Sequence, residues 1–479
     1  MERILSCLVS ILTKNTRTGR FFRTLGGSYI LLGAATLYSF LNIPIILNYA
    51  GQETLGMWLL VSQITTYLTA IDAGLTHSSI RQFVGPVAAG QPSKLAPRFQ
   101  STLAIAVFQG FAIALAGCGG SGLVAQIWGI PPTLKGEFIL LFSAQSILLG
   151  LTFPLRPFSS ILLAAQKFAP NYIWNAIFLS AAIFLGWFGF LLGWGIWGLF
   201  AGNVLVGFGQ FFFAIRGVAK MNFLPGLFAG WQIRRKDFGI IARESLSFAS
   251  APLFATATGL LQSSVLSRLF GLEGVALWNV GAKAAVILSQ ILSKLFESSF
   301  SGFSELVETG RRDLMLVRFG QVVGWALAAS GGLAFLLLFF NDPFISIWTS
   351  GKVSWPEWGT WWVGLLLLLT ISHLAFSESM KMLVLWSAIR TTPALDFCFF
   401  SCAMGIAFFV GGFSVFVAAA VLGPFVVGIC ANTLAFQRGT GRSLWSLIPK
   451  RFQVVVLSLF MGYSMMGLLS LANSISGKR

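Results

Sequence analysis

Charged residues are scarce in this sequence. Only 10% of its 479 residues are charged, 56% are apolar, and the mean hydropathy is +0.81. A soluble globular chain carries roughly 25% charged residues. Because so few charges cannot cover a folded surface in water, lipid must replace water around most of the molecule. The scarcity of charge therefore excludes a soluble globular protein and predicts a membrane protein.

Several chemical signatures are also missing. The sequence has no G-x-x-x-x-G-K-[ST], which excludes ATP hydrolysis at a P-loop, and it has no H-E-x-x-H zinc motif. Its two histidines are far apart, and its five cysteines form no C-x-x-C pair and lie in apolar runs. We therefore expect no catalytic residues, metal, cofactor or disulfide. A membrane polysaccharide polymerase or ligase is disfavoured, because the predicted external loops are too short for an active site.

Long apolar runs dominate what is present. A run of about 20 apolar residues is long enough to cross a bilayer as a helix. Thirteen such runs can be marked, and the division between the eleventh and twelfth rests only on Gly411 and Gly412. The predicted spans cover residues 25–48, 52–75, 99–123, 137–160, 169–192, 194–215, 247–268, 273–300, 319–341, 358–381, 394–413, 416–436 and 453–473.

Lysine and arginine orient these spans. With the N-terminus inside the cell, most of the 32 basic residues fall on the cytoplasmic side. Those on the opposite side are Lys135, Arg268, Lys352, Lys478 and Arg479. The net charge of +17 is thus a topology signal for a multi-pass protein of the bacterial inner membrane. It indicates no nucleic-acid partner, although basic loops also suit anionic membrane lipid.

The second half of the sequence aligns with the first half at one constant offset. The matching pairs are Gly51 and Gly271, Glu53 and Glu273, Trp58 and Trp278, Arg98 and Arg318, and Trp128 and Trp348. Because an even number of predicted spans separates the copies, both halves face the same way across the membrane. This predicts an all-α polytopic membrane protein with two six-helix bundles as a parallel internal repeat. The 12 core transmembrane helices are followed by a thirteenth.

The spans, the repeat and the basic loops divide the chain into five parts. Residues 1–24 lack a cleavage pattern after their apolar run, so they form an interfacial helix or a frayed basic tail. Transporters with such a repeat bind substrate between their halves and rock them, and the alternative is an old duplication without rocking. The parts are a cytoplasmic arm 1–24, an N-terminal lobe 25–215, a basic cytoplasmic linker 216–246, a C-terminal lobe 247–437 and an extension 438–479 with the extra hydrophobic segment.

The eighth span carries a polar stripe. A charge at mid-bilayer costs roughly 2.5–3.5 kcal/mol, so it usually faces protein or water. At 100° per residue, the polar residues of this span fall within about 60° of one another, which predicts a helix lining an aqueous cavity. For Lys294 and Glu297, which lie nearest the cytoplasm, an equal alternative is an i,i+3 ion pair that snorkels to water. The stripe comprises Asn279, Lys283, Gln290, Lys294, Glu297 and Ser301.

Two candidate charges lie on and after the second span. Asp72 shares a face with three threonines, and it either lines the cavity or caps the turn at Gly74. Arg81 follows at the predicted cytoplasmic mouth of the cavity.

Arg156 is a candidate anion site in the fourth span. It lies between Pro154 and Pro157, which bend a helix and free backbone carbonyls. A guanidinium group binds phosphate through two parallel hydrogen bonds. The alternative is that Arg156 snorkels toward the loop that contains Lys167.

The tenth and eleventh spans carry ionisable residues for which a structural role is favoured. Glu378 and Lys381 are spaced i,i+3, which favours an ion pair over a proton relay. His373 is interpreted as a satisfied interior histidine. Thr392 as N-cap, followed by proline at the first helical position, makes Asp396 a first-turn acid favoured by the helix dipole.

Two stretches of the sequence resemble bacterial polysaccharide flippases, which include O-antigen repeat-unit flippases. These belong to the multidrug/oligosaccharidyl-lipid/polysaccharide exporter superfamily. The similarity is diffuse but covers nearly the whole chain, and Gln262 is neutral where relatives often carry an acid. The stretches are Asn42-Ile43-Pro44 through Gly51, Gly56, Trp58, Asp72-Ala73-Gly74-Leu75 and Arg81, and Ser267-Arg268-Leu269-Phe270-Gly271-Leu272-Glu273-Gly274-Val275.

This resemblance implies two six-helix lobes around a central cavity and a flippase for cell-surface polysaccharide biosynthesis. Its substrate would be a polyprenyl-diphosphate-linked oligosaccharide, turned from the cytoplasmic to the outer leaflet by alternating access. The expected partners are this lipid-linked oligosaccharide, membrane lipid and other polysaccharide-assembly membrane proteins. A cation-coupled multidrug exporter of the same superfamily is the alternative, and a flippase for lipid-linked peptidoglycan precursors also stays open.

Overall fold

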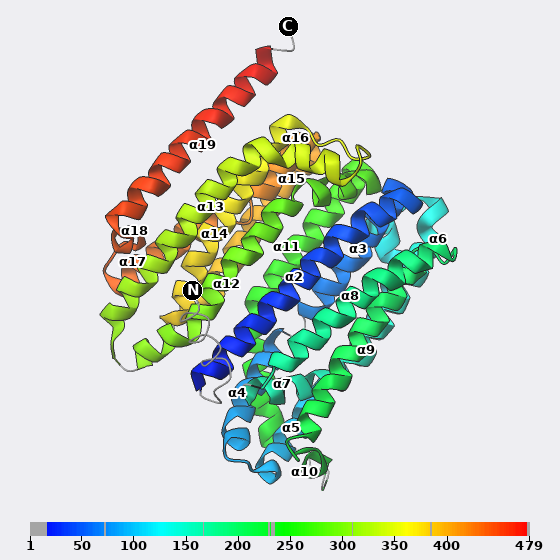
Figure 1. Ribbon diagram of the computed structural model, residues 1–479, viewed down its shortest axis with the longest axis vertical. Helices are drawn as coiled ribbons and strands as arrows, with labels where there is room; N and C mark the ends of the chain where they lie inside the picture. Colours follow the sequence, from blue (N-terminus) through cyan, green and yellow to red (C-terminus); the bar gives the residue numbers. More distant parts are fainter. Residues whose placement is uncertain are drawn as a thin grey trace, which may run out of the picture. The chain divides into compact units, whose positions relative to one another are not determined.

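The structure is a computed structural model that describes residues 17–70, 73–165, 167–228, 230, 235–308, 310–383 and 386–476. This part of the chain consists of helices joined by turns and contains no strand (Figure 1). Nine of its helices are long and apolar enough to cross a membrane, and a bent pair, Leu253–Gly281 with Lys283–Phe296, makes a tenth. The prediction of an all-α, multi-pass membrane protein is confirmed.

The chain divides into two compact units between Leu253 and Phe254, inside one long helix. The predicted linker 216–246 and the boundaries of the five predicted parts stay predictions. The first unit contains α2 (Arg17–Tyr49), α3 (Gly51–Ala70), α4 (Ala73–Ala88), α5 (Pro92–Ile127), α6 (Pro132–Thr152), the 3₁₀ turn η1 (Phe153–Leu155), α7 (Arg156–Ala164), α8 (Ala169–Leu191), α9 (Trp197–Ala219), α10 (Leu224–Phe228) and the start of α11 (Arg235–Gly281).

The second unit contains the rest of α11 and the helices that follow it. These are α12 (Lys283–Glu308), α13 (Arg312–Trp348), α14 (Glu357–Met382), α15 (Trp386–Val410), α16 (Phe413–Leu422), α17 (Val426–Thr440), α18 (Leu444–Leu447) and α19 (Lys450–Ser476). The predicted division at Gly411 and Gly412 is confirmed, because both glycines have positive φ and separate α15 from α16.

The internal repeat is visible in the backbone. Gly51 begins α3 with φ 84°, and Gly271, its counterpart in the second copy, interrupts α11 with φ 65°. Gly90 has φ 62°, and its counterpart Gly310 has φ 76°. Positive φ is a conformation that glycine adopts far more readily than other residues. Turns of the same kind, at the same spacing, therefore end corresponding helices in the two halves.

The first unit packs around one large apolar cluster. Side chains from α4, α5, α7, α9 and α10 form it, including Phe83, Phe99, Phe158, Val218 and Leu227. The rings of Phe99 and Phe158 meet edge to face with centroids 5.0 Å apart. This cluster fixes α7, and with it Arg156, against α4 and α5.

Two segments differ from the sequence prediction. Helix α2 begins at Arg17, so residues 17–24 of the expected arm continue the helix of the first span; residues 1–16 lie outside the described residues. The expected span 416–436 lies within the candidate span Phe413–Thr440, but its helix is interrupted, because α16 ends at Leu422 and α17 begins at Val426. Pro424 lies in this break and cannot donate a backbone hydrogen bond.

The expected thirteenth segment is the 27-residue helix α19, which packs along α13 and α14 of the second unit (Figure 1). A helix of this length is about 40 Å long, but α19 is not among the described helices that are both long and apolar enough to cross a membrane, so its crossing stays a prediction. A Cβ on Gly331 of α13 would lie 3.2 Å from the Cβ of Leu459 of α19. The Tyr463 hydroxyl donates to the carbonyl oxygen of Trp361, so α19 is an integral part of this unit.

Candidate functional site

A neutral polar network joins three helices in the interior of the first unit. The Tyr38 hydroxyl (α2) donates to Asn203 Oδ1 (α9) at 3.4 Å, and Asn203 Nδ2 donates to Gln145 Oε1 (α6) at 3.2 Å. A second amide pair joins α8 to α9, where Asn175 Nδ2 donates to Gln210 Oε1 at 3.2 Å. Such interhelical hydrogen bonds satisfy polar groups that lipid cannot. None of these five side chains carries a charge at neutral pH.

The second unit holds an ionisable pair in its own interior. His373 Nε2 of α14 lies 3.1 Å from Asp396 Oδ2 of α15, and Asp396 is only 8% exposed. The other carboxylate oxygen, Oδ1, is buried and has no hydrogen-bond partner among the described residues. The ring of Phe425 meets the imidazole edge to face with centroids 5.6 Å apart. A carboxylate and an imidazole thus share a largely buried site among three helices.

Helix α17 closes this site from the third side. Gly428 is the third residue of α17, and a Cβ placed on it would overlap both carboxylate oxygens of Asp396. The carboxylate therefore lies against the first turn of α17, where backbone N–H groups carry partial positive charge. Thr392 lies one turn before Asp396, and Asn432 lies one turn after Gly428. The Thr392 hydroxyl donates to Asn432 Oδ1 at 3.0 Å and ties α15 to α17.

This geometry corrects the interpretation of Asp396. We expected it in the first turn of a helix capped by Thr392, but α15 begins at Trp386 and contains Pro393 in its interior. Asp396 is therefore a mid-helix acid, and it is buried by contact with His373. His373 has a side-chain partner, as expected, but that partner is ionisable. The two residues lie on different helices, at a sequence separation that carries no periodic signal.

Lys283 lies where the helix of the eighth span is broken. It is the half-buried first residue of α12, and the segments before and after Ala282 meet at 45°. Asn341 of α13 donates from Nδ2 to the Gly281 carbonyl at 3.3 Å, which satisfies backbone at the break. The Trp355 ring packs directly against Gly281, leaving no room for a side chain there.

The break divides the predicted polar stripe. Asn279 lies before it and donates to the Val275 carbonyl at 2.8 Å. After it, Gln290 is exposed and Lys294 is half-buried. Val286, on the expected apolar face of the helix, is 40% exposed. The polar stripe and the apolar face therefore do not differ in how deeply they are buried within the unit. The side chains of Glu297 and Ser301 lie outside those described.

Arg156 occupies the predicted irregular point of the fourth span. The helix is interrupted by η1, and Arg156 begins α7 with its guanidinium carbon 4.0 Å from the centroid of the Phe153 ring. This cation–π contact holds a half-buried cation within the span. Arg81 is exposed on α4, the helix that packs against α7. Asp72 lies outside the described residues.

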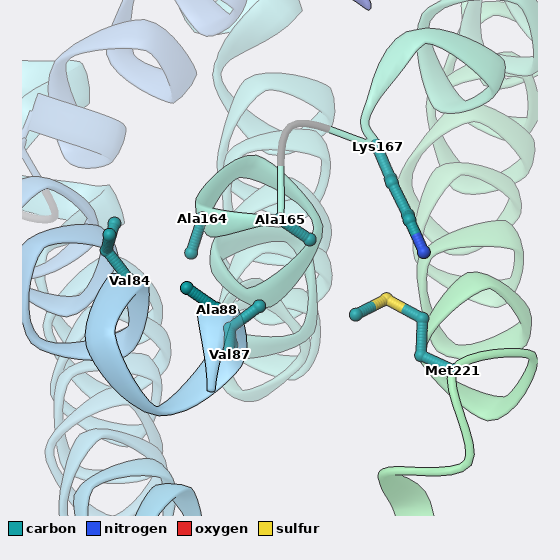
Figure 2. A pocket seen from close by; sticks show the side chains of 7 residues that line it. All are labelled: Val84, Val87, Ala88, Ala164, Ala165, Lys167 and Met221. Atoms are coloured by element: carbon teal, nitrogen blue, oxygen red, sulfur yellow. The ribbon is translucent and has the colours of Figure 1, made fainter. Parts of the chain in front are cut away.

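A pocket of about 340 Å³ lies at one end of the first unit, between α4, α7 and α9. Figure 2 shows its lining, with the Lys167 ammonium directed toward Met221 and the small apolar side chains on the other side. None of the predicted site residues lines it. The lining residues are Val84, Val87, Ala88, Ala164, Ala165, Lys167 and Met221.

The predicted site residues therefore fall into two groups. Arg81 and Arg156 belong to the first unit, whereas Asn279, Lys283, Gln290 and Lys294 belong to the second. The assignment of these residues to one substrate cavity stays a prediction.

Comparison with known proteins identifies the fold. No protein-family model matches the chain, and no curated protein matches its sequence. Solved structures of transporters do match. An outward-facing multidrug resistance MATE family transporter of the MOP superfamily has a TM-score of 0.62, with 14% identity over 92% of this chain and 98% of the other.

Two further structures agree with the first. An inward-facing multidrug resistance MATE family transporter has a TM-score of 0.63, with 15% identity over 88% of this chain and 98% of the other. The Vibrio cholerae MATE transporter VcmN in its bent form has a TM-score of 0.57, with 18% identity over 90% and 98%. The chain has the fold of the MATE transporters of the MOP superfamily.

Proposed function

We propose that this chain is a membrane transporter that works by alternating access between its two halves. The observation that carries the proposal is the fold, which is shared over about nine-tenths of the chain with transporters solved in outward-facing and inward-facing forms. Polar groups inside both units fit a protein that moves a polar or charged solute through hydrocarbon, since such solutes do not cross unaided.

Export of small organic molecules is the substrate class that the fold supports first. Two of the structural neighbours are described as multidrug resistance MATE family transporters. In this proposal the chain is the cation-coupled exporter that the sequence left as an alternative.

Drug export can be tested in a bacterial strain that lacks its major exporters. Expression of the chain should lower the steady-state accumulation of ethidium and norfloxacin. The matched control is Asp396→Asn, which removes one negative charge from the second unit at almost constant volume and should restore accumulation. Equal accumulation with wild-type chain and empty vector, at confirmed membrane expression, would remove this substrate class.

A flippase for polyprenyl-diphosphate-linked oligosaccharide is the second candidate. Two half-buried cations within spans, Arg156 and Lys283, favour it, because a diphosphate needs positive charge on its route. At an effective dielectric near 20, one charge pair about 4 Å apart contributes on the order of 4 kcal/mol before desolvation. The expected partners, which are membrane lipid and polysaccharide-assembly proteins, belong to this candidate.

The charge of these residues provides the test of the flippase candidate. Arg156→Ala and Lys283→Ala should reduce cell-surface glycan, while Arg156→Lys and Lys283→Arg retain part of it. Arg156→Lys should retain less than Lys283→Arg, because it loses the two-pronged guanidinium. Lys352→Ala, on an exposed turn, is the control and should be silent. Normal glycan in both alanine variants would remove the cation-based argument.

The proposed location is the bacterial inner membrane with a cytoplasmic N-terminus. Reporter fusions after residue 236 should read cytoplasmic, and fusions at Arg479 should read external. An external signal at residue 236 would reverse the whole orientation. A cytoplasmic signal at Arg479 would mean that α19 does not cross the membrane.

A further inference from the structure

We infer that the pocket at the end of the first unit, between α4, α7 and α9, binds an anionic glycerophospholipid of the surrounding membrane. Three observations carry this inference: an apolar wall held by the core, a lysine ammonium directed across it, and a scarcity of acids in the segment that builds it. The pocket has a volume of about 340 Å³, which lies in the range of small-ligand sites, roughly 300–1,000 Å³. The inference goes beyond the proposed transport function, because lipid binding here needs no transported substrate.

The pocket lies where membrane-crossing segments end. The segment Pro132–Ala164 and helix α9 are both long and apolar enough to cross a membrane. Ala164 itself lines the pocket, and α9 ends at Ala219, two residues before the lining residue Met221. Membrane helices end where hydrocarbon gives way to lipid headgroups. A lipid at this depth has its phosphate beside the pocket, and the predicted topology places this end in the cytoplasmic leaflet, whose anionic lipids attract basic residues.

The apolar wall of the pocket is continuous with the core of the first unit. Val87 belongs to the large buried cluster of this unit, and Ala164, Ala165 and Met221 pack against that cluster. Because these side chains are held by the core, the wall is formed before any ligand binds. Alanine at three lining positions leaves the space open, and the apolar surface suits the hydrocarbon of a lipid.

Lys167 supplies the positive charge. Its backbone N–H donates to the carbonyl oxygen of the buried Leu162 at 2.9 Å, the bond that closes a helix end in a Schellman motif, so the start of its side chain is fixed. Figure 2 shows the ammonium directed toward Met221. Lys167 is exposed, and no side chain among the described residues pairs with it. A fixed cation next to an apolar wall matches a phosphate that carries acyl chains.

The segment that builds the pocket contains almost no acid. Between residues 73 and 228 the only acidic residue is Glu137, near the start of α6, at the opposite end of the crossing segment from the pocket. The exposed lysines Lys94 and Lys220 belong to the same stretch. On the neighbouring helix α11, Asp237 does not line the pocket. The local potential therefore favours an anion.

A lipid phosphate fits this pocket better than a free phosphate does. Free phosphate is commonly bound by backbone N–H groups at helix N-termini or by forked arginine contacts. Here α7 and α9 present their C-terminal ends, which carry partial negative charge, and the lining offers a single lysine. The apolar part of the lining gains nothing from a free anion but is removed from water by a lipid. The occupant must therefore contribute apolar surface as well as charge.

Photocrosslinking of lipid to the purified full-length protein tests the site. Phosphatidylglycerol with a photoreactive diazirine in its acyl chain is titrated into the detergent-solubilised protein, and the yield on the peptide containing Met221 is measured by mass spectrometry. We expect saturable crosslinking. Unlabelled phosphatidylglycerol should compete better than phosphatidylcholine with the same acyl chains. Inorganic phosphate should compete no better than chloride at equal ionic strength.

Two charge variants test the role of the headgroup. Lys167→Gln should weaken phosphatidylglycerol binding about fivefold, the effect of one lysine near an anionic lipid surface, while competition by phosphatidylcholine stays the same. Lys167→Arg should retain binding. Lys94→Gln is the matched control, because it removes an equal charge from an exposed residue outside the pocket, and it should bind as wild type does.

Two bulk variants test the role of the apolar wall. Ala88 is an exposed lining residue, so Ala88→Leu fills space without entering the core and should weaken crosslinking by both lipids. Ala89→Leu, at the exposed neighbouring residue outside the lining, is the control and should be silent. Melting temperatures equal to that of wild type would show that all variants are folded.

Three results would overturn the lipid site. Equal losses in Lys167→Gln and Lys94→Gln would reduce it to a general attraction between lipid and a basic surface. Equal competition by the two lipids would remove headgroup recognition, and displacement by phosphate at constant ionic strength would make it a free-anion site. Absence of ethidium export would leave lipid binding untouched and count against the substrate proposal alone.

Discussion

Each of the two units joins neighbouring helices through a polar pair, but the pairs differ in chemistry. In the first unit, Asn175 of α8 bonds to Gln210, a pair of neutral amides. The offset that carries Gly51 to Gly271 carries Asn175 to the position beside Asp396 of α15, whose partner is His373. Both pairs join neighbouring helices in an apolar interior, but only the second can change its charge.

This difference separates two uses of buried polarity. An amide pair links helices at any pH, and in membranes such links contribute only about 0.6 kcal/mol on average. An acid–imidazole pair links helices and also responds to pH, at the cost of keeping an acid away from water. The duplicated halves therefore both tie this helix to a neighbour through polar side chains, while only the second does so with ionisable groups.

The largest expected effect comes from removing one partner of each pair. His373→Ala leaves Asp396 buried without its partner, and we expect a loss of about 3–5 kcal/mol in unfolding free energy at neutral pH. Gln210→Ala leaves only a neutral amide and should cost about 0.6–1.7 kcal/mol. Equilibrium unfolding in mixed detergent and SDS micelles measures both values.

A double substitution sharpens this comparison. His373→Ala combined with Asp396→Ala removes the unpaired charge and should be more stable than His373→Ala alone. If His373→Ala and Gln210→Ala cost the same, the pair in the second unit is not energetically distinct from the amide pair.

Corresponding helices also use their glycines differently. In the first unit, Gly110 of α5 brings its backbone against Gly150 of α6. In the second unit, Gly320, Gly324 and Gly331 of α13, the counterpart of α5, meet α18, the segment after it and α19. The second unit thus uses glycines of this helix, at other positions than Gly110, as the attachment site of α19.

The next largest effect tests the glycine contact of the first unit. A Cβ at Gly110 would overlap the Gly150 carbonyl oxygen, so Gly110→Ala should cost about 1–3 kcal/mol through overpacking. Gly119→Ala, on the same helix with nothing within 4 Å, is the control and should be neutral. Thermal unfolding of the purified proteins would reveal the difference, and equal melting temperatures would contradict the close approach.

A smaller effect is expected at the turn that marks the repeat. Gly271 has φ 65° and ψ −167°, a region that is almost restricted to glycine. Gly271→Ala should cost about 1–2 kcal/mol from backbone strain alone, since no atom lies within 4 Å of its Cβ position. Gly332→Ala, also in open space but inside helix α13, should not destabilise the protein. Equal unfolding free energies of Gly271→Ala and Gly332→Ala in SDS micelles would mean that Gly271 has ordinary helical backbone.

The membrane fold could be predicted because its signals are local. Apolar run length located the spans that α5, α8 and α9 form, and positive-φ glycines at 51 and 271 fell on the predicted repeat. The break before α17 was missed, because Pro424 lies in a run that is otherwise apolar throughout. The start of α2 at Arg17 was missed, because basic residues mark the end of the membrane-embedded part of a helix and not the end of the helix itself.

The polar sites were harder to predict. A stripe at helical spacing identified Lys283, but the break at Ala282 that sets Asn279 apart depends on Asn341 and Trp355 from other helices. The pairing of His373 with Asp396 likewise depends on how α14, α15 and α17 pack. One sequence gives the face of each helix and leaves its neighbour undetermined.

The smallest expected effect is that of Tyr463→Phe in α19. The Tyr463 ring is buried and stacks on Trp361 with centroids 6.1 Å apart, while its hydroxyl donates to the Trp361 carbonyl. Tyr463→Phe keeps the ring and loses one hydrogen bond, so it should cost about 0.6 kcal/mol. Tyr463→Ala also loses the ring and should cost about 3–5 kcal/mol. Equal, negligible losses in SDS unfolding would show that α19 contributes little to the second unit and that the glycine face of α13 is not its attachment site.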